Sequence, residues 1–310
     1  MFKYILKRLL LMIPTLFGVV LIVFTIMNMT PGDPGRTILG TSASQEQVDQ
    51  LNHELGYDQP FVTRFVDYCS DLLHGDFGTS YRSRTPFTTE LMGRLPTTLR
   101  LGIAAFVLSS IFGILLGIFS AVKQYSFADT FCSVTAILFA SIPGFFLGMV
   151  LLYVFGLKLG WFPTLSSTAD FRSMVLPVIT LTLSSTVSVQ RLSRTTMLEA
   201  VRQDYIRTAK AKGCSQSRVT WKHALKNAIL PVITVMGINA GTVMGGAVIC
   251  ETVFSLPGMG TYILMAIRSK DIPVVMSSTV LLSAIFCIIM ILVDVLYAVI
   301  DPRIRERVAR

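Results

Sequence analysis

Six long apolar runs, separated by polar segments, dominate the pattern of hydrophobic and polar positions. The runs extend over residues 9–29, 101–122, 130–157, 173–190, 227–250 and 272–293. Each is close to the roughly 20 residues that a helix needs to cross about 30 Å of hydrocarbon. The pattern therefore predicts an all-α polytopic membrane protein with six transmembrane helices.

The composition agrees with this class of protein. Of the 310 residues, 52% are hydrophobic and 15% are charged, whereas soluble domains have about 45–50% apolar and about 25% charged residues. The net charge of +9 would indicate a nucleic-acid partner only if the basic residues formed a patch on a soluble domain. They are instead sorted by position along the chain, so we predict no nucleic-acid partner.

The distribution of Lys and Arg predicts the orientation in the membrane, because basic residues near span ends are kept in the cytoplasm. Three precede the first run, nine lie in the 191–226 link against two acids, Glu199 and Asp204, and four follow Ile300. We therefore expect both termini and this link in the cytoplasm. The first run follows a basic start like that of a signal peptide. It is long and has no small-residue cleavage site after it, so we expect a retained span.

The polar segment 30–96 has the opposite composition, with nine acids, five Arg and no Lys. We expect it outside the membrane, as a small helical cap, because apolar residues recur there at helical spacing. Those residues are Val48, Leu51, Leu55, Phe61, Phe65 and Tyr68. The predicted organisation is a cytoplasmic N-terminus with the first helix (1–29), this extracytoplasmic segment, and a membrane core (97–310).

Small residues recur at four-residue spacing within the apolar runs, which lets helix backbones approach closely. These residues are Gly113 and Gly117, Gly144 and Gly148, and the triplet Gly237, Gly241 and Gly245. Two interpretations stay open from the spacing alone. The glycines pack helices within the bundle, or they form an interface with a second membrane subunit or a seam that slides during gating.

Asp294 is the ionisable residue that lies clearly inside the end of an apolar run. A carboxylate within a membrane is a candidate for function. An ion pair with Arg191 or Arg194 is the interpretation that we favour, and a proton relay is the alternative. Ion-driven carriers place charges near the midplane and contain an internal repeat. We find neither, so we expect the energy for transport to come from another source.

Motifs for chemistry are missing from the sequence. It contains no Gly-x-x-x-x-Gly-Lys-Ser/Thr loop to hold ATP phosphates, no His-Glu-x-x-His pair and no Gly-x-Ser-x-Gly elbow. The five cysteines are scattered without Cys-x-x-Cys spacing, which argues against metal or disulfide chemistry. We predict no catalytic residue, cofactor or metal site. A lipid-modifying enzyme would need a cluster of such groups.

The 191–226 link has the pattern of an ordered helix rather than of a short connection. Thr196 and Glu199 fit a capping box at a helix start, and Gly213 suits the left-handed residue that ends a helix. An apolar stripe is predicted along this helix at 197–213, made by Leu198, Val201, Tyr205 and Ala209. Ser215 is expected to cap a second helix. A solvated basic face or contact with anionic lipid is the alternative, but the spacing favours a protein socket.

The chain resembles the inner-membrane permeases of ATP-binding-cassette (ABC) importers, in the dipeptide, oligopeptide and nickel group. Asp204–Gly213 and His223–Pro231 match the coupling loop of that group. Further matches lie at Pro31–Pro34, Gly75–Gly78, Glu251–Gly260 and Asp301–Arg305. The matches cover the whole chain and are far more specific together than any one of them alone.

Three positions depart from the family pattern. Arg207-Thr208-Ala209 stands where the broader importer signature has Glu-Ala-Ala, so the role of that Glu is not assigned here. Leu256 replaces a Trp that is common before Pro-Gly. The segment from Lys270 to Pro273 reads Lys-Asp-Ile-Pro, where the group often has Arg-Asp before a proline. We expect such departures to tune gating or substrate choice.

The resemblance implies a permease subunit of the bacterial cytoplasmic membrane that forms half of a path for peptides. Its implied partners are a homologous second permease, two ABC ATPase subunits, an extracytoplasmic substrate-binding protein and membrane lipid. Metal chelates such as nickel complexes, or glutathione, are alternative substrates, and an ion-coupled secondary transporter is the alternative class. The implied coupling residues, expected to seat the apolar stripe in an ATPase groove, are Glu199, Val201, Asp204, Tyr205, Arg207, Thr208, Ala209, Lys212 and Gly213. The 251–273 region, in which Pro257, Gly258 and Gly260 are expected to break any helix, is the implied external gate together with Glu251.

Overall fold

The computed structural model describes residues 2–30, 32–164 and 170–300, and within them it contains helices and no strand. The side chain of Asp294, Pro31 and the motif at 301–305 lie outside the described residues. The described chain divides into two compact units. The core unit comprises residues 97–257 with the two chain ends, 1–8 and 288–310, and the cap unit comprises residues 9–96 and 258–287.

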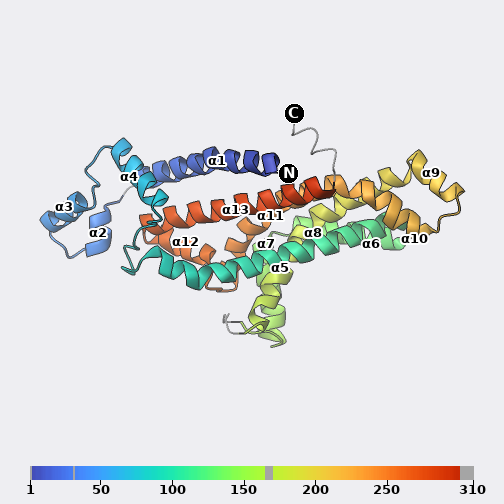
Figure 1. The fold of residues 1–310 in the computed structure, drawn as a ribbon. Coiled ribbons are helices and arrows are strands. Elements are labelled where there is room, and N and C mark those ends of the chain that lie inside the picture. The colour runs from blue at the N-terminus through green and yellow to red at the C-terminus, as the bar shows by residue number, and fades with distance from the viewer. Residues whose placement is uncertain (1, 31, 165–169, 301–310) are drawn as a thin grey trace. The chain divides into compact units, whose positions relative to one another are not determined.

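Among the described residues, five helices are long and apolar enough to cross a membrane. They are α1 (Phe2–Met29), α5 (Phe87–Val122), α8 (Arg172–Val201), α11 (Leu225–Val253, preceded by α10, Gln216–Arg218, and the π-helix η2, Val219–Ala224) and α13 (Ile272–Ile300). The predicted all-α membrane fold is therefore confirmed (Figure 1). Several helices extend past the apolar runs, because a helix continues beyond the hydrocarbon where packing supports it.

The predicted span at 130–157 is a bent pair of helices rather than one continuous helix. This region consists of α6 (Phe127–Ser141), α7 (Gly144–Leu151) and the π-helix η1 (Leu152–Lys158), and the two halves are bent by 101°. The bend falls at Ile142, which is extended (φ −90°, ψ 122°). Pro143 causes it, because a proline disfavours the helical conformation of the residue before it and provides no amide for the helix.

The helices of the core unit pack through small residues. A Cβ atom on Gly117 would lie 2.5 Å from the Ser193 Cβ atom, and one on Gly113 would lie 2.6 Å from the Val189 Cβ atom. Real Cβ atoms do not approach so closely, so α5 and α8 touch at backbone distance only because these two residues are glycines. For this pair, packing within the bundle is confirmed.

Helices α8 and α11 lie side by side in the core unit (Figure 1). The Asn239 side chain donates to the Ser185 carbonyl over 3.2 Å. Apolar side chains from α5, α8 and α11 form the main core, which includes Leu101, Leu176, Leu181, Val243 and Phe254. The buried Asn239 amide thus adds a hydrogen bond to an otherwise apolar contact between α8 and α11.

The cap unit contains the helical segment predicted between residues 30 and 96. It folds as α2 (Pro34–Leu39), α3 (Gln45–Glu54) and α4 (Phe61–Leu73), followed by the first turns of α5. Helical structure at Val48 and at Phe61–Tyr68 is confirmed. The α4 rings pack on α1, with ring centroids of Phe65 and Phe17 5.7 Å apart. Phe17 lies well inside the predicted first span, so α4 lies beside α1 rather than beyond its end.

The helix break predicted at Pro257, Gly258 and Gly260 is confirmed at the first two residues, since α11 ends at Val253 and both residues lie before α12 (Met259–Arg268), but it does not extend to Gly260. Helix α12 begins directly after Gly258, and Gly260 lies in its first turn. Met259 and Gly260 are buried in the cap unit. Burial of this turn outweighs the cost of about 1 kcal/mol that a glycine imposes on a helix.

Candidate functional site

The predicted helix start at Thr196 is wrong. α8 runs without interruption to Val201, and the Thr196 hydroxyl donates to the Leu192 carbonyl over 3.1 Å. Within a helix, Thr satisfies its hydroxyl by bonding back to the carbonyl four residues earlier. The residues before Thr196 are already helical, so the chain has no free amides there for a capping box to satisfy.

The helix of the link is α9 (Asp204–Ala211), which begins after a turn at Arg202 and Gln203. Its predicted end at Gly213 is confirmed, since this residue has φ +77°. The Gly213 amide donates to the Lys210 carbonyl over 2.9 Å, and the Cys214 amide donates to the Ala209 carbonyl over 3.2 Å. These two bonds form a Schellman motif, which requires a left-handed residue and therefore favours glycine.

The apolar face of α9 is buried within this chain, which corrects the prediction that it faces outward into a partner. Ile206 and Ala209 are buried against α5, α8, η2 and α11. The cluster is completed by Ile118, Ala121, Met197, Ala200, Val219, Ala224 and Ala228. The predicted stripe was counted from Leu198 through Tyr205, but the turn at residues 202–203 resets the helical register. Counted from Asp204, the spacing of Ile206 and Ala209 indicates the buried face.

The opposite face of α9 is exposed and basic. Tyr205, Arg207, Thr208, Lys210 and Lys212 are all exposed. Arg207 and Asp204 approach to 3.5 Å, and their side chains are 80% and 95% exposed, so this pair adds little to stability. Glu199, at the end of α8, is exposed and Val201 is partly buried. The exposed face thus offers mobile positive charge around one aromatic ring.

The end of α9 that adjoins Gly213 leads into the second predicted helix. Ser215 occupies the position before α10, as predicted, and its carbonyl accepts from the Val219 amide over 3.0 Å. Its side chain makes no capping hydrogen bond. The helical course from Gln216 to Val253 is continuous through η2, so the link joins α11 without a loop at Pro231.

A buried ion pair that the sequence analysis missed lies next to this link. Arg194 binds Asp129 with two nitrogens, each over 2.8 Å. Ser120 donates to the same carboxylate, and the Tyr125 amide donates to it over 3.0 Å. The pair joins α8 to the start of α6. Arg194 therefore has a partner other than the predicted Asp294. The signal for Asp129 was Ser126 three residues before it, a capping pattern ahead of an apolar run.

The predicted external gate residues occupy the end of α11 and the turn after it. Glu251 is fully buried and accepts from the Thr98 hydroxyl over 2.5 Å. Its backbone carbonyl accepts from the Leu256 amide over 2.8 Å. Pro257 is partly buried and Gly258 is buried. A buried carboxylate held by a hydroxyl fixes this turn to α5, and its role as a gate remains a prediction.

The three glycines on α11 do not share one packing environment. A Cβ atom on Gly237 would lie 3.0 Å from Val293, whereas one on Gly245 would have no atom within 4 Å. Gly241 is partly buried. Gly237 therefore packs inside the core unit, and Gly245 faces an open side of the chain.

A second polar cluster fixes the loop between α4 and α5 within the cap unit. The buried Asp271 carboxylate accepts from the Ser80 hydroxyl over 2.5 Å, from the Tyr81 amide over 3.1 Å and from the Arg82 amide over 3.3 Å. Ser277 donates to the Phe77 carbonyl over 2.6 Å. These contacts attach the loop to the start of α13. The sequence placed Asp271 in a segment that departs from the family pattern, without revealing these partners.

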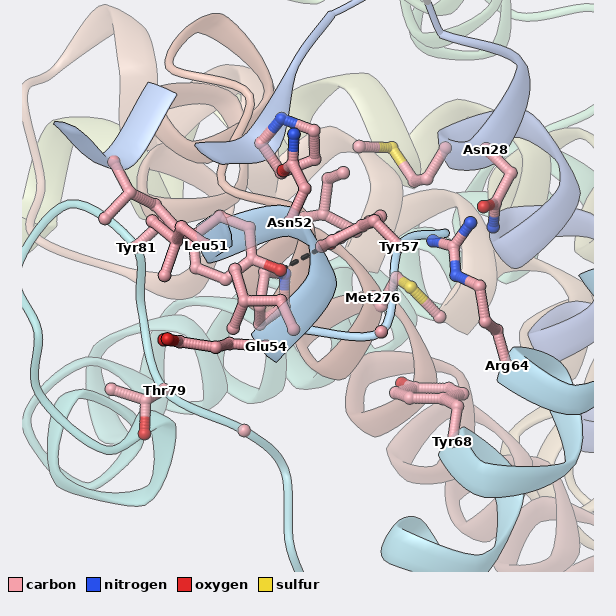
Figure 2. A pocket seen from close by; sticks show the side chains of 18 of the residues that line it. Asn28, Leu51, Asn52, Glu54, Tyr57, Arg64, Tyr68, Thr79, Tyr81 and Met276 are labelled. Carbon is pink, nitrogen blue, oxygen red and sulfur yellow. Dashed lines mark hydrogen bonds between the residues drawn. The ribbon is translucent and has the colours of Figure 1, made fainter. Parts of the chain in front are cut away.

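The cap unit also contains a cavity of about 1190 Å³. Its wall is formed by residues of α1, α2, α3, α4, the following loop and α13. Figure 2 shows Tyr57 and Tyr81 joined by a hydrogen bond between their hydroxyls in this wall. Burial raises the pKa of both tyrosines. Within the described ranges no three His, Cys, Asp or Glu side chains come together as metal ligands.

Two family models match the chain. The binding-protein-dependent transport system inner membrane component model matches residues 113–306. The model for the N-terminal part of such membrane components matches residues 1–102. Together the matches extend over both units.

Curated relatives and solved structures agree with these models. The glutathione transport system permease protein GsiC of Escherichia coli (strain K12) is 40% identical, over 99% of this chain and 100% of that protein. The dipeptide transport system permease protein DppB of Alkalihalophilus pseudofirmus is 38% identical, over 98% and 100%. The inward-facing MetNI methionine ABC transporter has a TM-score of 0.59 at 17% identity, covering 68% of this chain and 96% of that one. That structural likeness concerns the fold alone.

Proposed function

The chain belongs to the family of binding-protein-dependent transport system inner membrane components, and from this premise we propose that it carries peptides and is driven through the exposed face of α9. It is a permease of an ABC importer in the inner membrane. Its own sequence has no ATP-binding loop. The ATP hydrolysis that drives it is therefore supplied by partner subunits in this proposal.

The observation that carries the coupling proposal is the two-sided structure of α9. One face is anchored in the core unit by Ile206 and Ala209, and the other presents Tyr205, Arg207 and Thr208 to a partner. A force on the exposed face is therefore transmitted to α5, α8 and α11, because interiors are close-packed and deform little. The Schellman turn at Gly213 fixes the C-terminal end of α9.

The partners follow from the same family role. We propose an ATPase subunit on α9, a homologous second permease on the side of α11 that Gly245 leaves open, and an extracytoplasmic binding protein on the segment 30–96. This places the 191–226 link and both termini in the cytoplasm. The excess of Lys and Arg in the link and of acids in the segment 30–96 supports this orientation.

The proposed substrate is a short peptide. The two curated relatives are named for dipeptide and glutathione transport, and glutathione is itself a tripeptide derivative. Both substrates carry a free carboxylate and an ammonium group at a distance of a few bonds. Glutathione is accordingly the second candidate, and the metal chelates transported by the wider group are the third.

Charge reversal on the exposed face of α9 tests the coupling proposal. In proteoliposomes with the complete importer and its binding protein, Arg207→Glu should lower ATP-driven dipeptide uptake at least tenfold, because we propose that the basic exposed face of α9 meets acidic groups on the ATPase, and a carboxylate at this position would repel them. Arg172→Glu is the matched control, since Arg172 is also exposed but lies at the other end of α8. Equal uptake by the two variants would refute the coupling role of α9.

A further inference from the structure

Arg64 is a partly buried cation in the wall of the cap-unit cavity. Its guanidinium carbon lies 4.4 Å from the centroid of the Tyr57 ring and 5.9 Å from that of Phe24. Within residues 2–30, 32–164 and 170–300 no carboxylate lies within 4.0 Å of its guanidinium nitrogens, and its side chain makes no hydrogen bond. Arginine is seldom withdrawn from water without an anionic partner. Arg64 therefore has the features of an incomplete anion site.

The cation–π contact of Arg64 with Tyr57 leaves the guanidinium N–H donors without a hydrogen-bond acceptor among the described residues. These donors lie in the plane of the guanidinium group and point outward. Such a fork matches both oxygens of a carboxylate. Figure 2 shows Arg64 extending from α4 among the side chains that line the cavity. A carboxylate can therefore bind here without displacing the stacked ring.

The acidic residues of the same wall determine which anion fits. Seven carboxylates and two arginines line the cavity. Five of the carboxylates already accept hydrogen bonds from neighbouring groups: Asp33, Asp49, Glu54, Asp58 and Asp76. The other two, Asp67 and Asp71, accept none from described residues and follow Arg64 on α4. A simple anion would be repelled by this wall, whereas a ligand that also carries a positive charge would satisfy it.

The spacing along α4 fits a small zwitterion. Asp67 and Asp71 lie three and seven residues after Arg64, a rise of about 4.5 and 10.5 Å along the helix. Residues at these offsets share one face of a helix. An extended dipeptide spans about 7 Å between its charged ends at about 3.3–3.6 Å per residue. One end on Arg64 and the other near the two aspartates matches this length.

We propose that this cavity is a binding site for the charged termini of a short peptide. The α-carboxylate binds Arg64, and the α-ammonium group binds Asp67 and Asp71. The inference rests on the proposed function in taking peptide as substrate and in placing this segment outside the membrane. The cavity volume exceeds that of a dipeptide, so the site holds the peptide by its ends and leaves its side chains unrestricted. Binding by the charged ends alone suits a permease that must release its substrate during transport.

The proposed site is tested by measuring peptide binding to the importer in the absence of the extracytoplasmic binding protein. The complete importer is placed in phosphatidylcholine nanodiscs without nucleotide or binding protein, and dialanine binding is followed by saturation-transfer NMR. The wild type should bind dialanine. N-acetyl-dialanine and dialanine amide should each bind about tenfold more weakly, because each lacks one charged end, and a hydrogen bond to a charged group contributes about tenfold or more to affinity.

Variants then assign the binding to the proposed residues. Arg64→Gln should lower dialanine affinity about tenfold or more, and Arg64→Lys, which keeps the charge but not the fork, should lower it less. Arg84→Gln is the matched control, because Arg84 also lines the cavity but is exposed and makes no ring contact. Asp71→Asn combined with Asp67→Asn should abolish the preference for a free α-ammonium group.

Several results would overturn the inference. Equal dialanine affinity of Arg64→Gln and wild type would do so, as would tight binding of the acetylated peptide. Loss of the dialanine signal when phosphatidylethanolamine is added to the nanodiscs would make a lipid headgroup the ligand instead. Failure of the proposed function is distinguishable, because it would appear as absent ATP-driven dipeptide uptake in the complete system. Uptake without Arg64-dependent binding would leave the function standing and remove the site.

Discussion

Two polar connections of this chain are attached to their helices by opposite means. In the link between α8 and α11, α9 is attached through buried apolar side chains, Ile206 and Ala209. The loop between α4 and α5 is attached through a buried carboxylate, Asp271, which accepts three hydrogen bonds. Apolar burial is non-directional and tolerates small shifts. When one carboxylate accepts several hydrogen bonds, by contrast, losing that carboxylate removes all of the bonds together. The apolar attachment suits α9, which we propose moves together with the helices on which it packs. The polar attachment suits the loop between α4 and α5, which keeps one conformation in the cavity wall.

The largest effect is expected from removing the apolar attachment. Ile206→Ala should destabilise the docking of α9 by about 2–5 kcal/mol, because it leaves a cavity in a fully buried site. Hydrogen exchange of residues 204–211 in the complete importer should accelerate, and ATP-driven uptake should fall. Tyr205→Ala, on the exposed face of the same helix, should lower uptake without changing exchange. Unchanged exchange in Ile206→Ala would refute the assignment of the buried face.

A smaller effect is expected from removing the polar attachment. Asp271→Ala leaves the Ser80 hydroxyl and the Tyr81 and Arg82 amides without their acceptor, at a cost of about 1–3 kcal/mol. Amide exchange at residues 80–82 should accelerate while exchange in α9 stays the same. Asp76→Ala is the control, since that carboxylate is exposed and, among the residues that the structure describes, accepts from the Gly78 amide alone. Equal acceleration in both variants would show that Asp271 does not hold the loop.

The sequence predicted the membrane fold because that fold depends on average properties over long windows. Six apolar runs identified the five straight helices and the bent pair. The left-handed residue at Gly213 was predictable because few residues other than glycine adopt positive φ. Local chemistry of this kind is readable from a short stretch of chain.

The errors arose where a local pattern competes with its surroundings. Thr196 and Glu199 have capping-box spacing, but the helix already present around them leaves no free amides. The apolar stripe was assigned to the wrong face because a turn at residues 202–203 has no strong sequence signal. The register of α9 could be determined only after this break was known.

The polar clusters were missed because their partners are distant in sequence. Asp129 and Arg194 are 65 residues apart, and Asp271 is 191 residues from Ser80. The sequence analysis did not single out Asp129, and it named Asp271 without identifying its donors, because one sequence does not show which distant residues come together. The candidate coupling residues lie within an ordered link, and their coupling role stays a prediction; the distinction between the anchored and the outward face of α9 required three-dimensional packing.

The smallest predicted effect, a pH dependence, concerns Asp33, which orders the start of the cap. A hydrogen bond from Asn52 holds the pKa of Asp33 below its usual range, and the Arg36 amide also donates to it. A lowered pKa in the folded state stabilises the fold above the unfolded pKa of about 3.9, and this stability is lost as pH falls through the folded value. The group is partly exposed, so the contribution is below about 1 kcal/mol after solvent screening.

Pepsin cleavage of the 33–56 region, followed from pH 5 to pH 2, measures this contribution. Asp33→Asn lacks the titration and retains a capping oxygen, so the ratio of its cleavage rate to that of the wild type cancels the pH dependence of the protease. The variant should be cleaved up to about fivefold faster at pH 5. The two rates should converge as the pH falls through the lowered pKa of Asp33, because protonation removes the advantage of the wild-type carboxylate. A constant ratio across this range would show that the hydrogen bond from Asn52 to Asp33 makes no charge-dependent contribution to the stability of the cap.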